Sequence, residues 1–395
     1  MKVAMIGHKR VPSREGGVEI VVEELSTRMA NEGIQVDIYN RSGHNVAGSK
    51  YDKKNKKLKS YKGCRIITIF TFQNKKLNAV VYSFLAIVRA LFGRYDVIHF
   101  HAEGPCSMIW IPHFLGIRTV ATIHGLDWQR SKWGGFATKY LKLGEKTAAK
   151  YADEIIVLSK NVQQYFKDTY DRDTVYIPNG ISKTEIREAQ IITEKYGIGK
   201  DDYILFLARL VPEKGLDYLI EAFGKLDTDK KLVIAGGSSH TNDYVESIKK
   251  KVDKINEKTA KDKCIIMTGF VQGRELEELY SNAYVYVLPS DIEGMPISLL
   301  EAMSYGNCCL VSNIDENAEV LGTHGEKFSK SNVNSLYKKL CELIQDEDKV
   351  QSYRQNVKDY VLSEYSWDKV VDQTEKLYSK KNKAELDTVK EVLKL

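Results

Sequence analysis

The sequence predicts an α/β protein built from two Rossmann-like domains that face a central cleft. Its 395 residues are enough for two domains. Short apolar runs alternate with glycine-containing loops and with segments of helical periodicity, which is the pattern of a doubly wound parallel sheet. The pattern stops at Asn179-Gly180 and then begins again. We therefore predict one domain over residues 1–180 and a second over residues 181–366.

The first domain opens with a strand, a glycine loop and a helix. Residues 3–7 are apolar, and a polar loop after them ends at Gly16 and Gly17. From residue 18 to residue 29 the apolar side chains recur every three or four positions, as on one face of a helix. The two glycines would let backbone N–H groups approach an anion at the helix N-terminus. A plain turn at the start of a helix explains them equally well.

Further strands of this domain are nearly all apolar, as in a sheet with both faces covered. We predict them at residues 35–39, 64–70, 96–101, 118–123 and 154–158. His101 and Glu103 follow one strand, at the edge where such sheets bind ligands, and His124 and Asp127 follow the next. Beside His124, Asp127 forms with Trp128 and Arg130 a polar and aromatic cluster that is typical of sugar binding. An ordinary loop anchor with a structural histidine is the alternative.

The second domain repeats the alternation of strands and helices. Strands are predicted at residues 203–208, 231–235, 264–268, 283–288 and 308–312, and helices near residues 215–226, 243–258, 273–281 and 297–305. A last helix is predicted at residues 367–378, before a charged tail.

Composition excludes several classes of protein. Hydrophobic residues make up 43% of the chain and charged residues 28%, as in an ordinary soluble protein. No apolar stretch reaches the roughly 20 uninterrupted residues that a membrane-spanning helix needs. Residues 1–6 lead directly into a strand, so we expect no signal peptide. The six cysteines form neither a CxxC pair nor a zinc spacing with histidine, which favours reduced thiols in a cytoplasmic protein.

The net charge of +6 is unevenly distributed. Residues 1–180 contain 28 basic and 16 acidic side chains, whereas residues 181–395 contain 31 basic and 37 acidic side chains. The basic half contains a lysine-rich run at residues 50–62 and an apolar helix at residues 78–93 with basic flanks. An anionic lipid surface or a lipid diphosphate fits this combination, and no nucleic-acid fold signature is present. A core helix beside a solvated loop is the alternative.

The segment from residue 290 to residue 303 is the most informative part of the chain. Glu293 follows a predicted buried strand, and Glu301 lies about two turns into the predicted helix that begins near Pro296. The helix N-terminus between the two carboxylates favours binding of a phosphate. Because carboxylates repel phosphate, we expect the two glutamates to bind hydroxyl groups beside it. A nucleotide sugar combines these groups. Alternatively, the two residues bind no ligand: Glu293 is a helix-cap carboxylate, and Glu301 lies at the edge of the core.

Arg209 and Lys214 supply positive charge near this segment. Both lie on a predicted strand-to-helix loop and could grip two phosphates of a diphosphate leaving group. A solvated surface pair is the alternative.

Four motifs together resemble the retaining nucleotide-sugar glycosyltransferases of the GT-B fold, family 4. EGMPISLLEAMSYG resembles the family's E-x7-E signature, ARLVPEKGLDYLIEAF its diphosphate loop, REGGVEIVVEELSTRMA its first glycine loop and TVYIPNG its interdomain hinge. IGHKRVPSREGGVE and ATIHGLDWQRSKWGG are similar to the bacterial rhamnosyltransferase branch, which builds capsular or cell-wall polysaccharide on a lipid carrier.

The resemblance implies a role for each candidate residue. The donor diphosphate would meet Arg209, Lys214 and the loop after the 283–288 strand. Glu293 would contact the donor sugar, Glu301 the ribose, and the His124 main-chain carbonyl would lie by the anomeric carbon. The remaining donor-binding residues would be Gly16, Gly17, Phe270, Val271, Gly294, Met295 and Ile297, and His101, Glu103, Asp127 and Arg130 would face the acceptor. The helix at residues 367–395 would cross back to the first domain.

The resemblance also implies a reaction. We expect transfer of a sugar, L-rhamnose from dTDP-rhamnose, to a lipid-linked saccharide with retention of configuration and no divalent metal. The enzyme would be cytoplasmic and peripheral on the inner face of the membrane. Its alternatives are a transferase that uses a UDP- or GDP-sugar on another acceptor and a non-catalytic sugar-nucleotide-binding partner protein.

Overall fold

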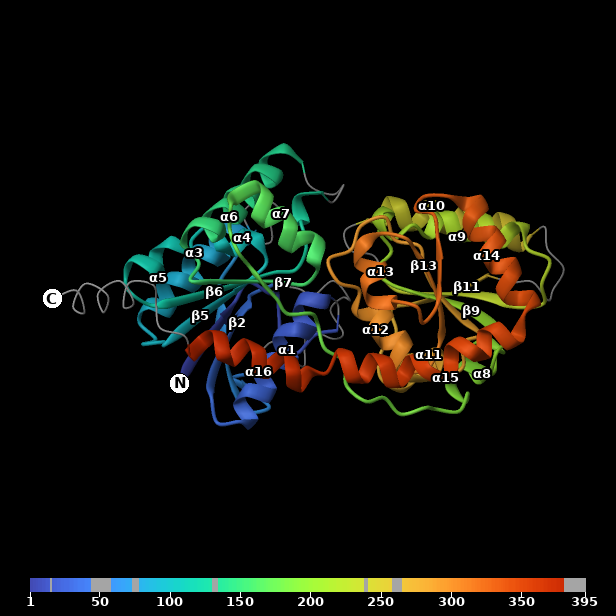
Figure 1. Ribbon diagram of the computed structural model, residues 1–395, viewed down its shortest axis with the longest axis horizontal. Coiled ribbons are helices and arrows are strands. Elements are labelled where there is room, and N and C mark those ends of the chain that lie inside the picture. Colours follow the sequence, from blue (N-terminus) through green and yellow to red (C-terminus); the bar gives the residue numbers. More distant parts are fainter. Residues whose placement is uncertain are drawn as a thin grey trace. The chain divides into compact units, whose positions relative to one another are not determined.

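The computed structural model describes residues 1–14, 16–43, 58–72, 78–129, 134–237, 241–257 and 265–379. The chain divides into two compact units (Figure 1): Met1–Gly180 together with the chain from Trp367 onward, and Ile181–Ser366. Each unit contains one largely parallel sheet with helices on both faces. The prediction of an α/β protein with two Rossmann-like domains is confirmed.

The sheet of the first unit has eight strands in the order β3-β4-β2-β1-β5-β6-β7-β8. These are β1 (Lys2–Ile6), β2 (Gln35–Arg41), β3 (Ser60–Tyr61), β4 (Cys64–Ile69), β5 (Val97–His101), β6 (Arg118–Ile123), β7 (Glu154–Val157) and β8 (Val175–Tyr176). Only β3 runs antiparallel to its neighbour. The chain leaves β1 toward β2 on one side and returns later to β5 on the other, so the switch in strand order lies between β1 and β5.

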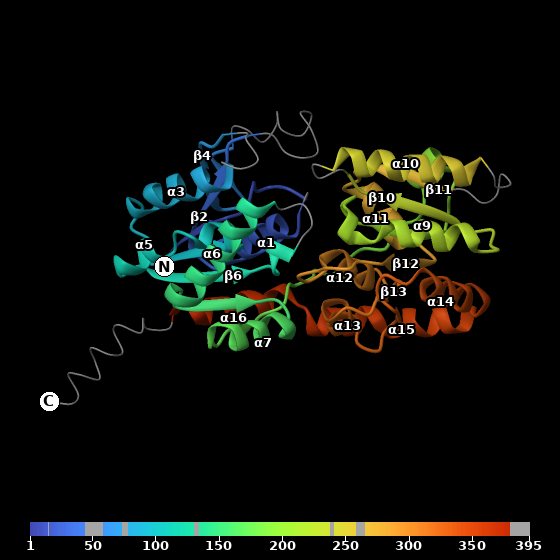
Figure 2. The ribbon, with the colours of Figure 1, turned by 90° about the horizontal axis from the view of Figure 1, so that it is seen from above.

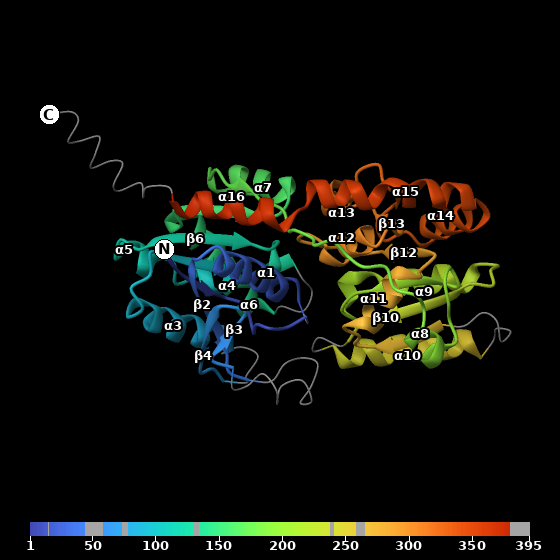
Figure 3. The same ribbon diagram turned by 90° about the horizontal axis from the view of Figure 1, so that it is seen from below.

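Helices cover both faces of this sheet. They are α1 (Gly17–Asn31), α3 (Asn78–Leu91), α4 (Glu103–Cys106), α5 (Trp110–Phe114), α6 (Gly135–Tyr151), α7 (Lys160–Tyr170) and α16 (Trp367–Ser379), with a short 3₁₀ turn η1 (Asp127–Gln129). Helices α3 to α6 pack on one another, whereas α1 packs with α16 (Figures 2 and 3). Helix α6 is not among the helices predicted from the sequence. Its buried positions include Gly144, Glu145 and Ala148, which leave only a weak apolar stripe.

The C-terminal helix α16 belongs to the first unit. It packs against α1 and β6. The Tyr378 hydroxyl lies 2.6 Å from Nδ1 of His99 on β5, and Arg118 on β6 donates to the Leu377 carbonyl at 2.8 Å. Gly180, the last residue before the chain enters the second unit, lies so close to Trp367 that a side chain there would clash with it.

The second unit has six parallel strands in the order β11-β10-β9-β12-β13-β14. These are β9 (Tyr203–Leu207), β10 (Lys231–Ala235), β11 (Ile265–Gly269), β12 (Val285–Leu288), β13 (Cys308–Ser312) and β14 (Glu326–Phe328). Its helices are α8 (Ile191–Tyr196), α9 (Leu216–Lys225), α10 (Asn242–Asn256), α11 (Arg274–Ser281), α12 (Ile297–Ser304), α13 (Asp315–Leu321), α14 (Val333–Gln345) and α15 (Glu347–Glu364), with a 3₁₀ turn η2 (Pro212–Lys214). Apolar residues of α9, α10 and α14 form the core on one face of the sheet. The switch in strand order lies between β9 and β12.

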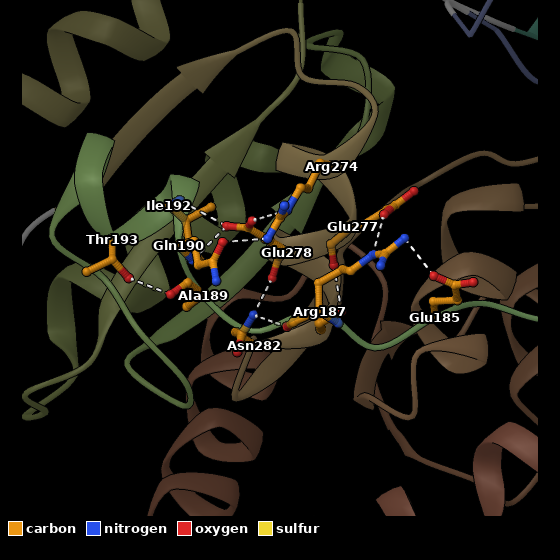
Figure 4. A network of polar contacts seen from close by, with 11 residues as sticks. Glu185, Arg187, Ala189, Gln190, Ile192, Thr193, Arg274, Glu277, Glu278 and Asn282 are labelled. Atoms are coloured by element: carbon orange, nitrogen blue, oxygen red, sulfur yellow. Dashed lines mark hydrogen bonds and ion pairs between the residues drawn. The ribbon is translucent and has the colours of Figure 1, made fainter.

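A polar network fastens the segment that enters the second unit to α11 (Figure 4). Glu278 is fully buried and accepts hydrogen bonds from the backbone N–H groups of Gln190 (3.0 Å) and Ile192 (3.2 Å). Arg274, one turn earlier on α11, donates to the same carboxylate at 3.1 Å. This carboxylate therefore fixes the start of α8 against α11.

Replacing Glu278 with alanine is expected to lower the free energy of unfolding by about 3 kcal/mol, because the N–H groups of Gln190 and Ile192 and the Arg274 side chain lose their acceptor. Urea unfolding followed by circular dichroism measures the change. Glu277→Ala is the matched control, since Glu277 makes a partly exposed ion pair with Arg187 and its loss costs about 1 kcal/mol or less. Equal costs for the two variants would contradict a structural role for the buried carboxylate.

No helix within the described ranges is both long and apolar enough to cross a bilayer.

Candidate functional site

The strand-order switch of the second unit brings two predicted loops together. Because β9 and β12 are parallel neighbours, the loop after β9 and the loop after β12 leave the same edge of the sheet. Lys214 ends η2 on the first loop, and Glu293 lies on the second. Their side chains form an ion pair that is almost shielded from water, with exposed fractions of 12% for Lys214 and 7% for Glu293. The sequence motifs predict both residues as donor ligands but do not predict their contact.

Backbone contacts hold these two loops in place. The Asp291 N–H donates to the Glu213 carbonyl at 2.9 Å. Tyr218 and Ser331 donate to the Asp291 carboxylate at 2.9 and 2.7 Å. Gly215 follows η2 with φ +65°, and a Cβ at this position would lie 2.0 Å from the Pro289 carbonyl oxygen. The close approach of the loops thus requires glycine at position 215.

The second loop passes directly into α12. Gly294, Met295 and Ile297 are buried, and Pro296 is the N-cap residue, so the helix begins one residue later than the proline. Glu301 therefore lies one turn into α12, which corrects the prediction of about two turns. Its carboxylate accepts a hydrogen bond from Tyr280 at 3.1 Å, which orients it.

Three further predicted donor residues, Arg209, Phe270 and Val271, lie at the same edge of this sheet. Arg209 is half-buried and follows β9 after one residue. Phe270 and Val271 follow β11, and Val271 is buried. A Cβ on Gly237, which follows β10, would lie 3.5 Å from the Phe270 side chain. The ends of β9, β12 and β11 therefore carry the predicted phosphate, sugar and base ligands, with β10 between β9 and β11 in the sheet.

The strand-order switch of the first unit gathers histidines. Gly7 follows β1 with φ +128°, and a Cβ there would lie 2.0 Å from the His101 carbonyl oxygen, so these strand ends approach closely. The rings of His99 and His101 are stacked with centroids 4.2 Å apart. His101 Nδ1 lies 3.1 Å from His124 Nε2, and His99 Nε2 lies 2.7 Å from the Thr122 hydroxyl. Two hydrogen bonds and the stacked pair of rings therefore connect His124 through His101 and His99 to Tyr378 on α16.

Burial keeps the imidazoles of His99 and His101 neutral, and also that of the buried His8, which follows β1. Desolvation lowers the pKa of His99 to about 3 and that of His8 to about 4. Burial lowers the pKa of His101 well below its usual value, and the neighbouring histidines lower it further. Since the pKa values in the folded state lie below the unfolded value of about 6.5, the unfolded chain binds more protons at acid pH. Stability is therefore full above pH 6.5 and declines below it.

The free energy of unfolding of the first unit is expected to fall as pH drops from 6.5 toward 4, by up to about 1.4 kcal/mol per pH unit for each buried histidine. Comparison with His99→Gln isolates one of them, because glutamine does not titrate. The stability gap between the native protein and this variant should narrow by about 1.4 kcal/mol per pH unit below pH 6.5. Urea unfolding at pH 7.5, 6.0 and 5.0 measures the gap, and a constant gap would contradict the expectation.

The predicted acceptor-side carboxylates belong to a buried cluster. Glu103 starts α4 and is fully buried. Desolvation, followed by the charges of Asp127 and Glu145, raises its pKa, so Glu103 holds a proton at neutral pH. Glu145 on α6 accepts hydrogen bonds from Trp128 (2.9 Å) and from two tyrosines on α7, Tyr165 (2.7 Å) and Tyr170 (2.6 Å). Through Trp128 it anchors η1, which carries Asp127. Arg130 lies outside the described residues.

The glycine loop starts α1. Gly16 is its extended N-cap residue, and Gly17 is its first helical residue. Glu19 in the first turn accepts a hydrogen bond from the Lys9 N–H at 2.9 Å, which ties the loop after β1 to the helix.

Sequence reasoning missed three side chains in these clusters. His99 precedes His101 by two positions on a strand, so the period of two could have placed both rings on one face. Glu145 and Tyr378 carry no such signal, because each lies in an ordinary amphipathic helix. Among the described residues, no group of three or more His, Cys, Asp or Glu side chains is arranged to hold a metal ion.

Comparisons with known proteins follow the division into two units. Residues 188–385 match the model of the family Glycosyl transferases group 1, and residues 15–185 match that of Glycosyltransferase Family 4. An uncharacterized glycosyltransferase of Methanocaldococcus jannaschii is 27% identical over 96% of this chain and 98% of its own. The Escherichia coli UDP-Gal:alpha-D-GlcNAc-diphosphoundecaprenol alpha-1,3-galactosyltransferase is 25% identical over 72% of this chain and 75% of its own. Sucrose-phosphate synthase from Thermosynechococcus elongatus shares the fold with a TM-score of 0.78 at 19% identity, over 95% of this chain and 98% of its own.

Proposed function

Because the chain belongs to the group 1 glycosyltransferases and has their GT-B fold, we propose that it transfers a sugar from a nucleoside diphosphate to a lipid-linked saccharide. The observation that carries the proposal is the shielded pair of Lys214 and Glu293 at the strand-order switch of the second unit. The resemblance of the sequence to the rhamnosyltransferase branch favours dTDP-rhamnose as donor. The product would contribute to a capsular or cell-wall polysaccharide.

In this proposal the second unit binds the donor. Lys214 and Arg209 contact the diphosphate, with backbone groups of residues 294–297. Glu293 contacts sugar hydroxyls, and Glu301, oriented by Tyr280, contacts the ribose. Phe270 and Val271 lie beside the base. Positive charge and fixed dipoles at the diphosphate stabilise the charge that develops on it as it leaves.

We assign the acceptor to the first unit. The acceptor hydroxyl oxygen bonds to the anomeric carbon while the bond from that carbon to the phosphate oxygen breaks, and the hydroxyl proton passes to the leaving diphosphate on the same face. Configuration is then retained without a covalent enzyme intermediate. The His124 main-chain carbonyl is assigned to the positive charge of the transition state, and Asp127 to acceptor hydroxyls.

The proposal places the protein at the inner face of the membrane, since a lipid-linked acceptor is held there. The name of the E. coli relative supports this acceptor class, because that enzyme acts on a diphosphoundecaprenol-linked sugar. The same name favours a second candidate donor, a UDP-sugar.

A panel of dTDP-, UDP- and GDP-sugars in a thermal-shift assay, followed by product analysis on a lipid diphosphate saccharide, tests the proposal. We expect stabilisation by one nucleotide class, a product with the donor's anomeric configuration by NMR, and turnover that persists in EDTA. Binding without turnover on any acceptor would favour the non-catalytic partner protein instead. Inversion of configuration, or loss of turnover in EDTA, would overturn the mechanism.

A further inference from the structure

Exposed large apolar side chains are concentrated in the first unit. Of the twelve that the described residues include, eleven lie in this unit, and the second unit contributes Ile186. Scattered apolar side chains are normal on a protein surface, but a cluster of them marks a surface that another body covers. The difference between the units therefore points to an interaction surface on the first.

Helix α3 is apolar on both of its sides. Its inner side buries Tyr82, Ala86 and Ala90 against the sheet. On its outer side Phe84 and Val88, four residues apart, are exposed, and Phe92 in the next turn is 79% exposed. An ordinary surface helix carries polar residues at such positions. The outer side of α3 is thus as apolar as a helix side that packs in a protein core.

Helix α5, which contacts α3 and α6 (Figure 2), extends this surface. It exposes Trp110 and Phe114, and Leu115 follows directly, with exposed fractions of 42%, 69% and 61%. The Phe114 ring contacts the ring of Tyr151, the last residue of α6, at a centroid distance of 5.5 Å. We call Phe84, Val88, Phe92, Trp110, Phe114 and Leu115 the α3–α5 apolar face.

Exposed basic side chains lie on α3, which carries part of this face, and on α6, which contacts α5. The exposed ionisable side chains on α3, α5 and α6 are basic, namely Arg89, Lys139, Lys142, Lys146 and Lys150. The single carboxylate of these helices, Glu145, is buried. Lys150 lies 5.1 Å from the Tyr151 ring that Phe114 contacts, so charge and apolar surface adjoin. The exposed Asp96 after α3 is already bonded to the Lys2 backbone nitrogen at 2.6 Å.

We propose that the α3–α5 apolar face inserts into the interface of an anionic bilayer while the exposed lysine and arginine side chains of α3 and α6 contact its headgroups. Aromatic side chains prefer this interface, and a helix whose outer side is apolar lies in its plane. A second copy of the chain would bring like charges together and is disfavoured. The inference rests on the proposed function in one respect, that a lipid-linked acceptor requires contact with a membrane. Helix α3 corresponds to the apolar helix that the sequence predicted as part of a lipid-binding surface. Most of the lysine run at 50–62 that was predicted with it lies outside the described residues.

Flotation with vesicles tests the proposal, without any sugar donor. The intact protein should bind vesicles of phosphatidylcholine with 30% phosphatidylglycerol. The variant Phe84→Ser/Phe92→Ser/Phe114→Ser should bind them at least roughly tenfold more weakly, because each exposed ring loses its burial in lipid. Ile186→Ser, which removes the exposed apolar side chain of the second unit, is the matched control and should bind as the intact protein does. Circular dichroism checks that both variants are folded.

Two further measurements separate the possible failures. Unchanged vesicle binding by the triple variant, or no binding by the intact protein, would overturn the proposal. So would a concentration-dependent dimer in sedimentation that the triple variant lacks, because the face would then be an interface between copies. Transfer to a water-soluble short-chain acceptor should be equal for all three proteins. If that transfer is absent from the intact protein while vesicle binding responds to the variant, the proposed reaction fails and the membrane surface stands.

Discussion

Replacing Lys214 with alanine is expected to lower the rate of sugar transfer by roughly a thousandfold, because the donor diphosphate loses a positioned positive charge as it leaves. The ammonium group lies at the strand-order switch of the second unit and is largely shielded from water. Shielding strengthens its interaction with a developing negative charge. Transfer from the nucleotide sugar identified in the donor panel, measured at saturating donor concentration, gives the change.

The same substitution also leaves Glu293 without its partner, so a structural effect must be separated from a catalytic one. Breaking a buried ion pair by removing one partner costs about 3 kcal/mol of stability. The double variant Lys214→Met/Glu293→Gln removes both charges and should recover most of that loss. Transfer should nevertheless remain depressed by roughly a thousandfold in the double variant.

Lys225→Ala is the matched control, since Lys225 forms an exposed ion pair with Glu221 on α9. We expect it to change neither transfer nor stability by a measurable amount. If the double variant regains activity together with stability, Lys214 serves only to neutralise Glu293. The role assigned to it at the diphosphate would then be wrong.

Replacing Gly215 with alanine is expected to cost about 4 kcal/mol of stability and to weaken donor binding at least roughly tenfold. The new Cβ would meet the Pro289 carbonyl oxygen at 2.0 Å, and the residue would keep an unfavourable φ of +65°. To relieve the clash, the loop of Lys214 must move away from the loop of Glu293. Urea unfolding and a donor titration measure the two effects.

Gly197→Ala separates backbone strain from the clash. Gly197 ends α8 with φ +60°, and a Cβ there would meet nothing within 4 Å. This variant should therefore lose only about 1 kcal/mol and bind the donor normally. Equal losses in the two variants would show that the contact with Pro289 does not hold the loops together.

The sequence was informative where a local pattern determines the structure. Strands buried on both faces, such as residues 203–207 and 285–288, are visible as apolar runs, and the glycine and proline around them mark the turns. The order of these runs also suffices for the fold class. The start of α12 was predicted within one residue, because Pro296 restricts where that helix can begin.

Contacts between distant residues could not be predicted in this way. Lys214 and Glu293 are separated by 79 positions, and their contact depends on β9 and β12 being neighbours in the sheet. The anchoring of Trp128 by Glu145 likewise depends on how α6 packs. The sequence pattern identifies polar residues that end strands, whereas their pairing follows from tertiary structure.

Because α16 belongs to the first unit, that unit cannot be completed until nearly the whole chain has been synthesised. Residues 1–180 leave the ribosome early, but Tyr378 and Leu377, which bond to His99 and Arg118, are added only after the whole second unit. At ordinary elongation rates the delay is roughly ten to forty seconds. During that time the nascent first unit exposes the surface that α1 and β6 later present to α16. A stop codon after residue 366 would therefore damage the half of the protein that was synthesised first.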